Sequence, residues 1–168
     1  GHVGESVCLH SPFHCDFGEQ ISVGDHFVGN FNLTILDEAP VTIGDHVFIG
    51  PNVGLYTVNH ALLPEQRNAG IMRSLPIRIG NNVWIGGNTV VMQGVTIGDN
   101  TVIGAGSVVT RDIPAGVIAV GSPCRSCGRS PKRTALQRYI KKRRNAPEIG
   151  ALLYSIESPW KSSSNVIP

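Results

Sequence analysis

The sequence has few aromatic residues and few charges. Of its 168 residues, 6% are aromatic and 15% are charged, whereas about a quarter of the residues in an ordinary globular protein are charged. A core formed by this chain must therefore be aliphatic. No apolar run approaches the ~18 residues of a membrane-spanning helix, and no signal peptide is recognisable. We expect one domain of ordinary size in a cytoplasmic protein without a membrane span.

Cysteine is also sparse, with residues at Cys8, Cys15, Cys124 and Cys127. In a cytoplasmic protein these are expected to be reduced thiols. Cys124 and Cys127 have half of a zinc-binding spacing, but no second close pair of Cys or His accompanies them. The sequence therefore predicts no metal site.

The charges are distributed unevenly along the chain. Residues 1–122 hold 4 Lys and Arg against 10 Asp and Glu, and residues 123–168 hold 10 against 2. The sequence therefore predicts an acidic body and a basic tail. Within the tail the apolar spacing predicts helices over 132–144 and 147–156, followed by a disordered end over 158–168.

Aliphatic residues recur at every sixth position over much of the chain, and many of them precede a glycine. The six-residue frame is kept on both sides of one interruption, and a second apolar or small residue follows four positions after each anchor. The anchors are Ile43, Ile49, Leu55, Ile79, Ile85, Val91, Ile97, Ile103 and Val109.

A period of six fits neither an α-helix, which repeats every 3.6 residues, nor a single alternating strand. It fits a solenoid of short strands, with the anchors inside and Gly, Asn or Asp at tight corners that need unusual backbone angles. Three hexapeptides make one triangular turn, and about five turns, spaced ~4.8 Å apart, fit between residues 20 and 120. A β-sandwich with chance periodicity is disfavoured because six consecutive anchors stay in frame.

The repeat sets the predicted domain organisation of an all-β fold. We expect an N-terminal segment over 1–18, a parallel β-helix of hexapeptide repeats over 19–122, and a basic, partly α-helical extension over 123–168. The frame ends after Pro114 and is interrupted at about 56–76 by a polar, irregular stretch, which must leave the prism as a protruding loop. Loops on a rigid scaffold commonly carry functional residues.

Particular stretches of residues 13–125 add a family resemblance to this fold. Asn30, His60 and Trp84 stand in the contexts Gly29–Thr34, Thr57–Gly70 and Pro76–Gly87, and Gly121–Arg125 closes the repeat. In these stretches the sequence resembles the hexapeptide-repeat sugar O-acetyltransferases, the maltose and galactoside acetyltransferases. The resemblance implies a left-handed β-helix, which is an exception to the right-handed crossover rule. It also implies a homotrimer with sites between neighbouring prisms, in which an acetyl group passes from acetyl-CoA to a hydroxyl of a sugar or sugar-like acceptor.

Attack of a hydroxyl on a thioester needs a base, donors for the oxyanion and a means of holding the reactants together. Of the six histidines, only His60 lies in the protruding loop and matches the catalytic His of the family. Asn30 matches the family residue at the reacting centre. The alternative is a structural Asn that adopts the backbone conformation of a corner. The resemblance thus implies His60 as general base and Asn30 as a catalytic partner.

The resemblance also implies the residues that line the site. Asp16, Glu38, Met72 and Trp84 match positions on the acceptor side, with solvated acids and a packing tryptophan as alternatives. Small residues would let the extended arm of acetyl-CoA approach the backbone, and arginines would pair with its phosphates. The positions matched on the donor side are Gly87, Ala105, Thr110, Arg111 and Arg125.

Several other functions are compatible with parts of the sequence. The prism could acetylate a non-sugar acceptor, such as an antibiotic or secondary metabolite, or serve as a non-catalytic trimeric scaffold. A metal hydratase of the carbonic-anhydrase type needs a closely spaced His pair beside the prism, which the sequence lacks. The basic tail is interpreted as a solvated helix, as phosphate-binding arginines, or as a nuclear-localisation or nucleic-acid patch; few aromatic residues are present there to stack on bases.

Overall fold

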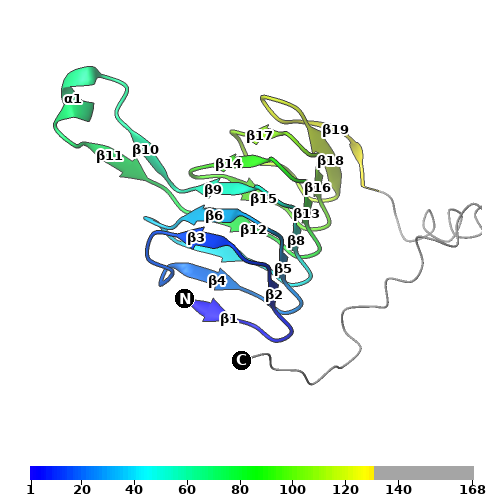
Figure 1. The fold of residues 1–168 in the computed structure, drawn as a ribbon. Helices are drawn as coiled ribbons and strands as arrows, with labels where there is room; N and C mark the ends of the chain where they lie inside the picture. Colours follow the sequence, from blue (N-terminus) through cyan, green and yellow to red (C-terminus); the bar gives the residue numbers. More distant parts are fainter. Residues whose placement is uncertain (131–168) are drawn as a thin grey trace, which may run out of the picture. The chain divides into compact units, whose positions relative to one another are not determined.

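Residues 1–130 are described by the structure, a computed structural model, and form a parallel β-helix with three sheets (Figure 1). Each of the first five turns contributes one short strand to each sheet, and the chain passes from sheet A to sheet B to sheet C. Sheet A consists of β1 (His2–Val3), β4 (Ile21–Val23), β7 (Val41–Ile43), β12 (Ile77–Ile79) and β15 (Thr96–Ile97).

The other two sheets are built in the same way. Sheet B consists of β2 (Cys8–Leu9), β5 (Val28–Gly29), β8 (Phe48–Ile49), β13 (Trp84–Ile85), β16 (Val102–Ile103), β18 (Val117–Val120) and β19 (Arg125–Arg129). Sheet C consists of β3 (Phe13–Cys15), β6 (Leu33–Leu36), β9 (Gly54–Tyr56), β14 (Val90–Met92) and β17 (Val108–Val109). The prism therefore has an A–B, a B–C and a C–A corner.

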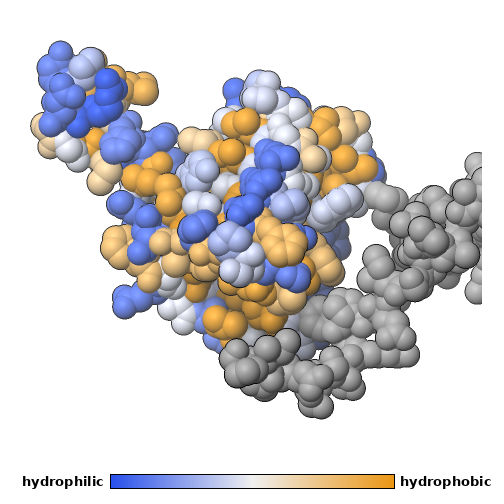
Figure 2. All heavy atoms as spheres, viewed as in Figure 1, coloured by the Kyte–Doolittle hydropathy of each residue, from blue (hydrophilic) through white to orange (hydrophobic). Residues whose placement is uncertain are grey.

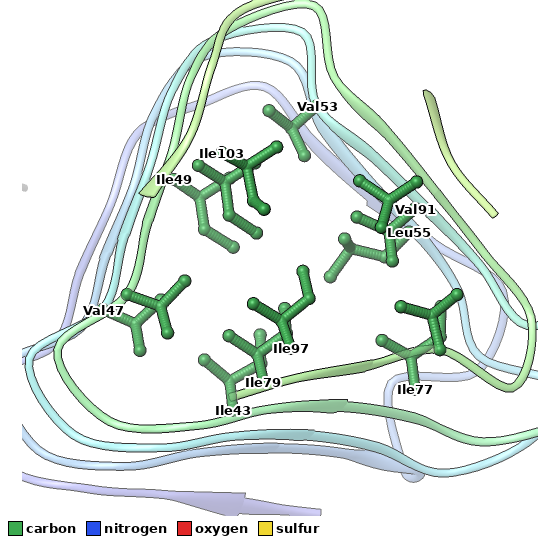
Figure 3. Packing of buried hydrophobic residues seen from close by; sticks show 14 of the residues in the cluster. Ile43, Val47, Ile49, Val53, Leu55, Ile77, Ile79, Val91, Ile97 and Ile103 are labelled. Atoms are coloured by element: carbon green, nitrogen blue, oxygen red, sulfur yellow. The ribbon is translucent and has the colours of Figure 1, made fainter. Parts of the chain in front are cut away.

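The predicted anchors fill the interior of the prism, where they point toward one another in a triangular section (Figure 3). Ile43, Ile79 and Ile97 stack on sheet A and are at most 3% exposed. Burying such a side chain contributes about 1.5–3 kcal/mol, so these columns are the main source of stability. The core is aliphatic as predicted: among residues 1–130, Phe27 is the only aromatic side chain in its buried cluster.

Polar ladders close the A–B corner between successive turns. The Asp45 carboxylate accepts the backbone N–H of Asp25 at 2.9 Å, and the Asn81 side-chain oxygen accepts the N–H of Asp45 at 2.8 Å. The next residues, His46 and Asn82, both adopt a φ of 55°, in the left-handed region that a tight corner requires. Corner Asp and Asn residues thus satisfy backbone donors that the short strands leave unpaired.

The β-helix begins earlier in the chain than the repeat predicts. Residues 1–18, which were expected to precede it, contain β1, β2 and β3 and form its first turn. Val3, Leu9 and Cys15 keep the six-residue spacing and pair in register with the second turn. This turn is hard to recognise in the sequence because eight residues, rather than six, separate Cys15 from the next anchor at Val23.

The interruption is an ordered hairpin rather than an irregular loop. β10 (Val58–His60) and β11 (Met72–Ser74) pair antiparallel, and α1 (Pro64–Asn68) forms the tip. At its root the Leu75 N–H donates to the Thr57 carbonyl at 2.8 Å. The hairpin leaves the prism at the C–A corner and projects away from it (Figure 1). Figure 2 shows hydrophobic side chains among the hydrophilic ones on this projection.

Sheet B continues beyond the end of the clear repeat at Pro114. β18 extends the sheet in parallel, and β19 turns back to pair antiparallel with β18. The tail helices predicted over 132–144 and 147–156 lie outside the described residues. Within residues 1–130, no helix has the length and apolar character needed to cross a membrane.

Candidate active site

His60 is presented by the hairpin. It ends β10, is exposed to solvent, and stands opposite Met72 in the antiparallel register. The Arg67 guanidinium donates to the carbonyls of Ala61 and Leu62, at 3.2 Å each. These bonds tie α1 to the end of the strand that carries His60. His60 and Met72 therefore lie side by side, on a projection that its own prism does not cover.

Asp16 and Glu38 lie at the C–A corner, in the turns that follow β3 and β6. Both side chains are exposed. The hairpin leaves the prism from the same corner, directly after β9. The two acids therefore lie at the corner from which the hairpin of His60 projects. Thr110 and Arg111 follow β17 at this corner as well, and both are exposed.

Trp84 projects outward from sheet B and is 56% exposed. In the parallel register it lies between Phe48, which is 46% exposed, and Val102. An open cavity of about 340 Å³ lies on this face, next to the A–B corner; its lining is His46, Phe48, Asn82, Val83 and Trp84. Sheet B therefore offers an apolar, partly aromatic outer surface.

Gly87 and Ala105 lie above one another at the B–C corner. A Cβ atom at Gly86 would come within 2.5 Å of the Ala105 nitrogen, so glycine is required there for the turns to stack. Asn30 occupies the same corner two turns below Gly87, and its side-chain oxygen accepts the Phe31 N–H at 2.9 Å. The small donor-side residues and Asn30 thus share one corner.

Arg125 lies at the upper end of the B–C corner. It begins β19 and pairs with Val120 at the end of β18. Its guanidinium donates to the Cys124 carbonyl at 2.8 Å, while the side chain remains exposed. A cation is therefore held beside the corner that carries Gly87 and Ala105.

The predicted site residues fall into two groups on opposite sides of one prism. In Figure 1 the hairpin projects on the side opposite sheet B, so His60 does not meet Asn30 within one chain. The B-side group comprises Asn30, Trp84, Gly87, Ala105 and Arg125. The hairpin-side group comprises Asp16, Glu38, His60, Met72, Thr110 and Arg111.

Sequence reasoning missed Asp37 and Phe48. Phe48 could have been found, because it precedes its anchor Ile49 just as Trp84 precedes Ile85. Asp37 is fully buried. Burial by itself would raise the pKa of this carboxyl, but backbone N–H donors, chiefly from the loop after β3, outweigh burial and hold the pKa below its ordinary value.

The cysteines are all free thiols. Burial raises the pKa of the Cys124 thiol, and a hydrogen bond with Ser107 only partly opposes this effect. In the part of the chain that the structure describes, no three His, Cys, Asp or Glu side chains are grouped so that they could hold a metal ion.

Two hexapeptide families match the chain. The family described as "Bacterial transferase hexapeptide (six repeats)" matches residues 76–111, and "Hexapeptide repeat of succinyl-transferase" matches residues 40–58. The nodulation protein L of Rhizobium meliloti (strain 1021) is 55% identical over 128 residues, which cover 76% of this chain and 70% of that protein. Measured over three such relatives, the chain spans 61–70% of their length.

Solved structures decide the family. A galactoside acetyltransferase in complex with coenzyme A is 51% identical, with a TM-score of 0.78, over 80% of this chain and 67% of that one. The chain belongs to the hexapeptide-repeat maltose and galactoside O-acetyltransferase family. A hexapeptide-repeat acetyltransferase of Vibrio cholerae O1 biovar eltor, solved with acetyl-CoA, is 46% identical with a TM-score of 0.76, covering 78% of this chain and 72% of that one. The predicted left-handed parallel β-helix and enzyme class are thereby confirmed.

Proposed function

We propose that this protein transfers an acetyl group from acetyl-CoA to a hydroxyl of a sugar or sugar-like acceptor, with His60 as the general base. The observation that carries the proposal is its likeness to acetyltransferases solved with CoA and with acetyl-CoA. The sugar class of the acceptor is supported by relatives named galactoside and maltose O-acetyltransferase. Its free thiols support a reducing, cytoplasmic location.

The reaction needs no covalent enzyme intermediate. The His60 imidazole takes the proton of the acceptor hydroxyl as its oxygen attacks the thioester carbonyl carbon, which forms a tetrahedral oxyanion. Collapse of the oxyanion expels the CoA thiolate, which receives the proton from the imidazolium. Asn30 is suited to hold the acceptor hydroxyl or the acetyl group through its side-chain amide.

The Gly87 N–H is suited to stabilise the oxyanion. The neighbouring Gly86 N–H donates to the Ile103 carbonyl at 2.8 Å, whereas the Gly87 N–H has no hydrogen-bond acceptor within residues 1–130. A preorganised backbone donor of this kind is worth about 10²–10³ in turnover. Arg125, and Arg111 from the hairpin side, are suited to pair with the phosphates of CoA.

The active site is proposed to form between copies of the chain in a homotrimer. His60 and Asn30 lie on opposite sides of one prism, so a site containing both needs the hairpin of one copy beside sheet B of the next. Both surfaces expose apolar side chains: the hairpin exposes Leu62, Leu63, Ile71 and Met72, and sheet B exposes Phe48 and Trp84. A repeated contact between two different surfaces forms a ring where its rotation closes, and a ring of three copies has three equivalent sites.

A mixing experiment tests the shared site. His60→Ala and Asn30→Ala should each be inactive, and reassembling them at equal amounts should restore about one quarter of wild-type activity. In a ring whose sites take one residue from each neighbour, this is the fraction of sites that keep both residues. Mixing His60→Ala with the His60→Ala/Asn30→Ala double variant is the control and should restore nothing. No recovery in the first mixture would refute a site shared between subunits.

The acceptor class needs its own test. Thiol release from acetyl-CoA should be faster with maltose or methyl β-D-galactopyranoside than with non-sugar alcohols of similar size. A preference for a non-sugar alcohol would replace the sugar in the proposal and leave the acetyl transfer in place.

A further inference from the structure

Two buried polar side chains lie at the C–A corner, beneath the hairpin-side group. Asp37 and Thr57 are both 0% exposed, and neither belongs to the predicted site. Asp37 lies in the turn between β6 and β7, and Thr57 lies one turn above it, between β9 and β10. Polar side chains this deeply buried normally have hydrogen-bond partners. The partners of Asp37 and Thr57 therefore identify the segments that these two residues hold in place.

Asp37 holds the loop that carries Asp16. One carboxylate oxygen accepts the N–H of Asp16 at 3.2 Å and of Phe17 at 3.0 Å, and the other accepts those of Gly18 at 2.8 Å and Gln20 at 3.3 Å. The Gln20 side chain donates back to the Asp37 carbonyl at 3.0 Å. One carboxylate thus fixes the whole loop from 16 to 20. Glu38, the second acceptor-side acid, is its direct neighbour.

Thr57 connects that turn to the root of the hairpin. Its hydroxyl donates to the Leu36 carbonyl at 2.6 Å and accepts the Ala39 N–H at 3.0 Å, so it brackets the turn that contains Asp37 and Glu38. Its backbone carbonyl accepts the Leu75 N–H at 2.8 Å, which closes the hairpin. A single residue therefore touches both the acceptor-side turn and the base of the hairpin that carries His60.

We propose that Asp37 and Thr57 are positioning residues for the acceptor: they hold Asp16 and Glu38 in a fixed relation to the hairpin of His60. This inference rests on the proposed function, because it takes Asp16, Glu38 and His60 as the groups that meet the acceptor. The chain of contacts runs from the 16–20 loop through Asp37 and its turn to Thr57 and the hairpin root. Neither side chain needs to touch the acceptor to act in this way.

The electrostatics of Asp37 support a positioning role. Its buried carboxylate is compensated by four N–H donors, and hydrogen bonds to an ionised acceptor are stronger than those between neutral groups. Removing one partner of such a network leaves the others unsatisfied. The loop is therefore held in one conformation only while all four bonds are present.

Kinetics of matched variants test the proposal. Asp37→Asn keeps one of the two acceptor oxygens, and Thr57→Val removes the hydroxyl at nearly constant volume. Because small displacements of reacting groups can lower rates by about 10²-fold, each variant should lower kcat/KM for maltose or methyl β-D-galactopyranoside about 10- to 100-fold. The KM for acetyl-CoA should not change, and Thr57→Ser should restore the activity.

The controls make the same chemical changes elsewhere. Asp45→Asn alters the A–B corner ladder, where Asn81 already does the same job, and Thr101→Val removes a buried hydroxyl bonded to Pro114 at 3.0 Å. Both should keep the kinetics of the wild type. A merely structural role would lower the melting temperature of Asp37→Asn and Thr57→Val while folded enzyme kept its kcat/KM, and that result would overturn the proposal.

Amide hydrogen exchange tests the positioning role of Thr57 independently of the proposed sugar acceptor. If the wild type acetylates neither sugar, the proposed acceptor class fails, yet Thr57→Val should still speed exchange at the Leu75 amide and within residues 16–20. Faster exchange confined to Ala39, or spread evenly over the prism, would show that Thr57 links nothing beyond its own turn and would refute the inference.

Discussion

Sheets A and B are alike inside the prism and different outside. Their inner faces both carry stacked isoleucines that are at most 3% exposed. From the second turn onward, the outward positions of sheet A are Ser22, Thr42, Arg78 and Thr96. Those of sheet B over its parallel strands are Val28, Phe48, Trp84, Val102 and Ile118. Since successive side chains of a strand point to opposite faces, the inner residues can fix the fold while the outer residues adapt each face to a different use.

The largest effect is expected from a substitution in the hairpin, which is proposed to lie beside sheet B of the next copy. His60→Ala removes the proposed base without touching the core, so turnover should fall about 10²–10⁴-fold with little change in melting temperature. Thiol release from acetyl-CoA with maltose measures the turnover. His14→Ala, on the exposed outer side of sheet C, is the control. More than half of the wild-type rate in His60→Ala would assign the base to another residue.

The same added charge should act differently on the two faces. An unpaired charge in a buried interface costs about 3–5 kcal/mol, so Phe48→Glu on sheet B should weaken trimer assembly about 100-fold or more. Thr42→Glu, in the same turn on sheet A, should assemble like the wild type. Light scattering over a range of concentrations measures the assembly. Equal behaviour of the two variants would show that sheet B is not an interface.

Arginines on the two faces offer a milder comparison. If Arg125, on β19 of sheet B, meets the phosphates of CoA, Arg125→Ala should raise the KM for acetyl-CoA about tenfold, in line with an exposed charge-assisted hydrogen bond. Arg78→Ala on the outer face of sheet A should leave this KM unchanged. Initial rates at varied acetyl-CoA decide the matter. An unchanged KM in Arg125→Ala would remove this residue from the donor site.

The smallest effect concerns pH and the C–A corner. The Asp37 pKa lies below the ordinary value of 3.8, so this carboxylate stabilises the fold fully above pH 3.8 and loses its effect as the pH falls below that value. The melting-temperature difference between wild type and Asp37→Asn should therefore be constant at higher pH and shrink as the pH falls below 3.8. Asp45→Asn at the A–B corner should give a small difference at every pH. A constant difference for Asp37→Asn would contradict its depressed pKa.

The prism could be predicted from the sequence because a six-residue period places one inward-facing aliphatic residue on each of the three sheets in every turn. The first turn was missed because Leu9, unlike the sheet B anchors Ile49, Ile85 and Ile103, is not followed by a glycine, and because the step from Cys15 to Val23 is longer than six residues. The hairpin was located correctly, yet its pairing was not predicted, since strands of three residues over 58–60 and 72–74 give no clear alternation.

The candidate site was predictable only as a set of residue types. His60 and Asn30 lie on opposite sides of one prism because they occupy different corners. Similarity between sequences does not say at which corner a residue lies. Asp37 was missed for a related reason. In the sequence it resembles the corner acids Asp25 and Asp45, and only the side chain's full burial and its four donors distinguish it.

The closed root of the hairpin makes the hairpin and the prism separable in evolution. Thr57 and Leu75 are joined by a backbone hydrogen bond of 2.8 Å, so the 17 residues between them enter and leave the prism at a single point. Insertions, deletions or exchanges within this excursion leave every inner column untouched. Under the proposed function, changes in this one excursion can alter what His60 and Met72 contribute to the site, while Asp16, Glu38 and Trp84 on the prism are inherited intact.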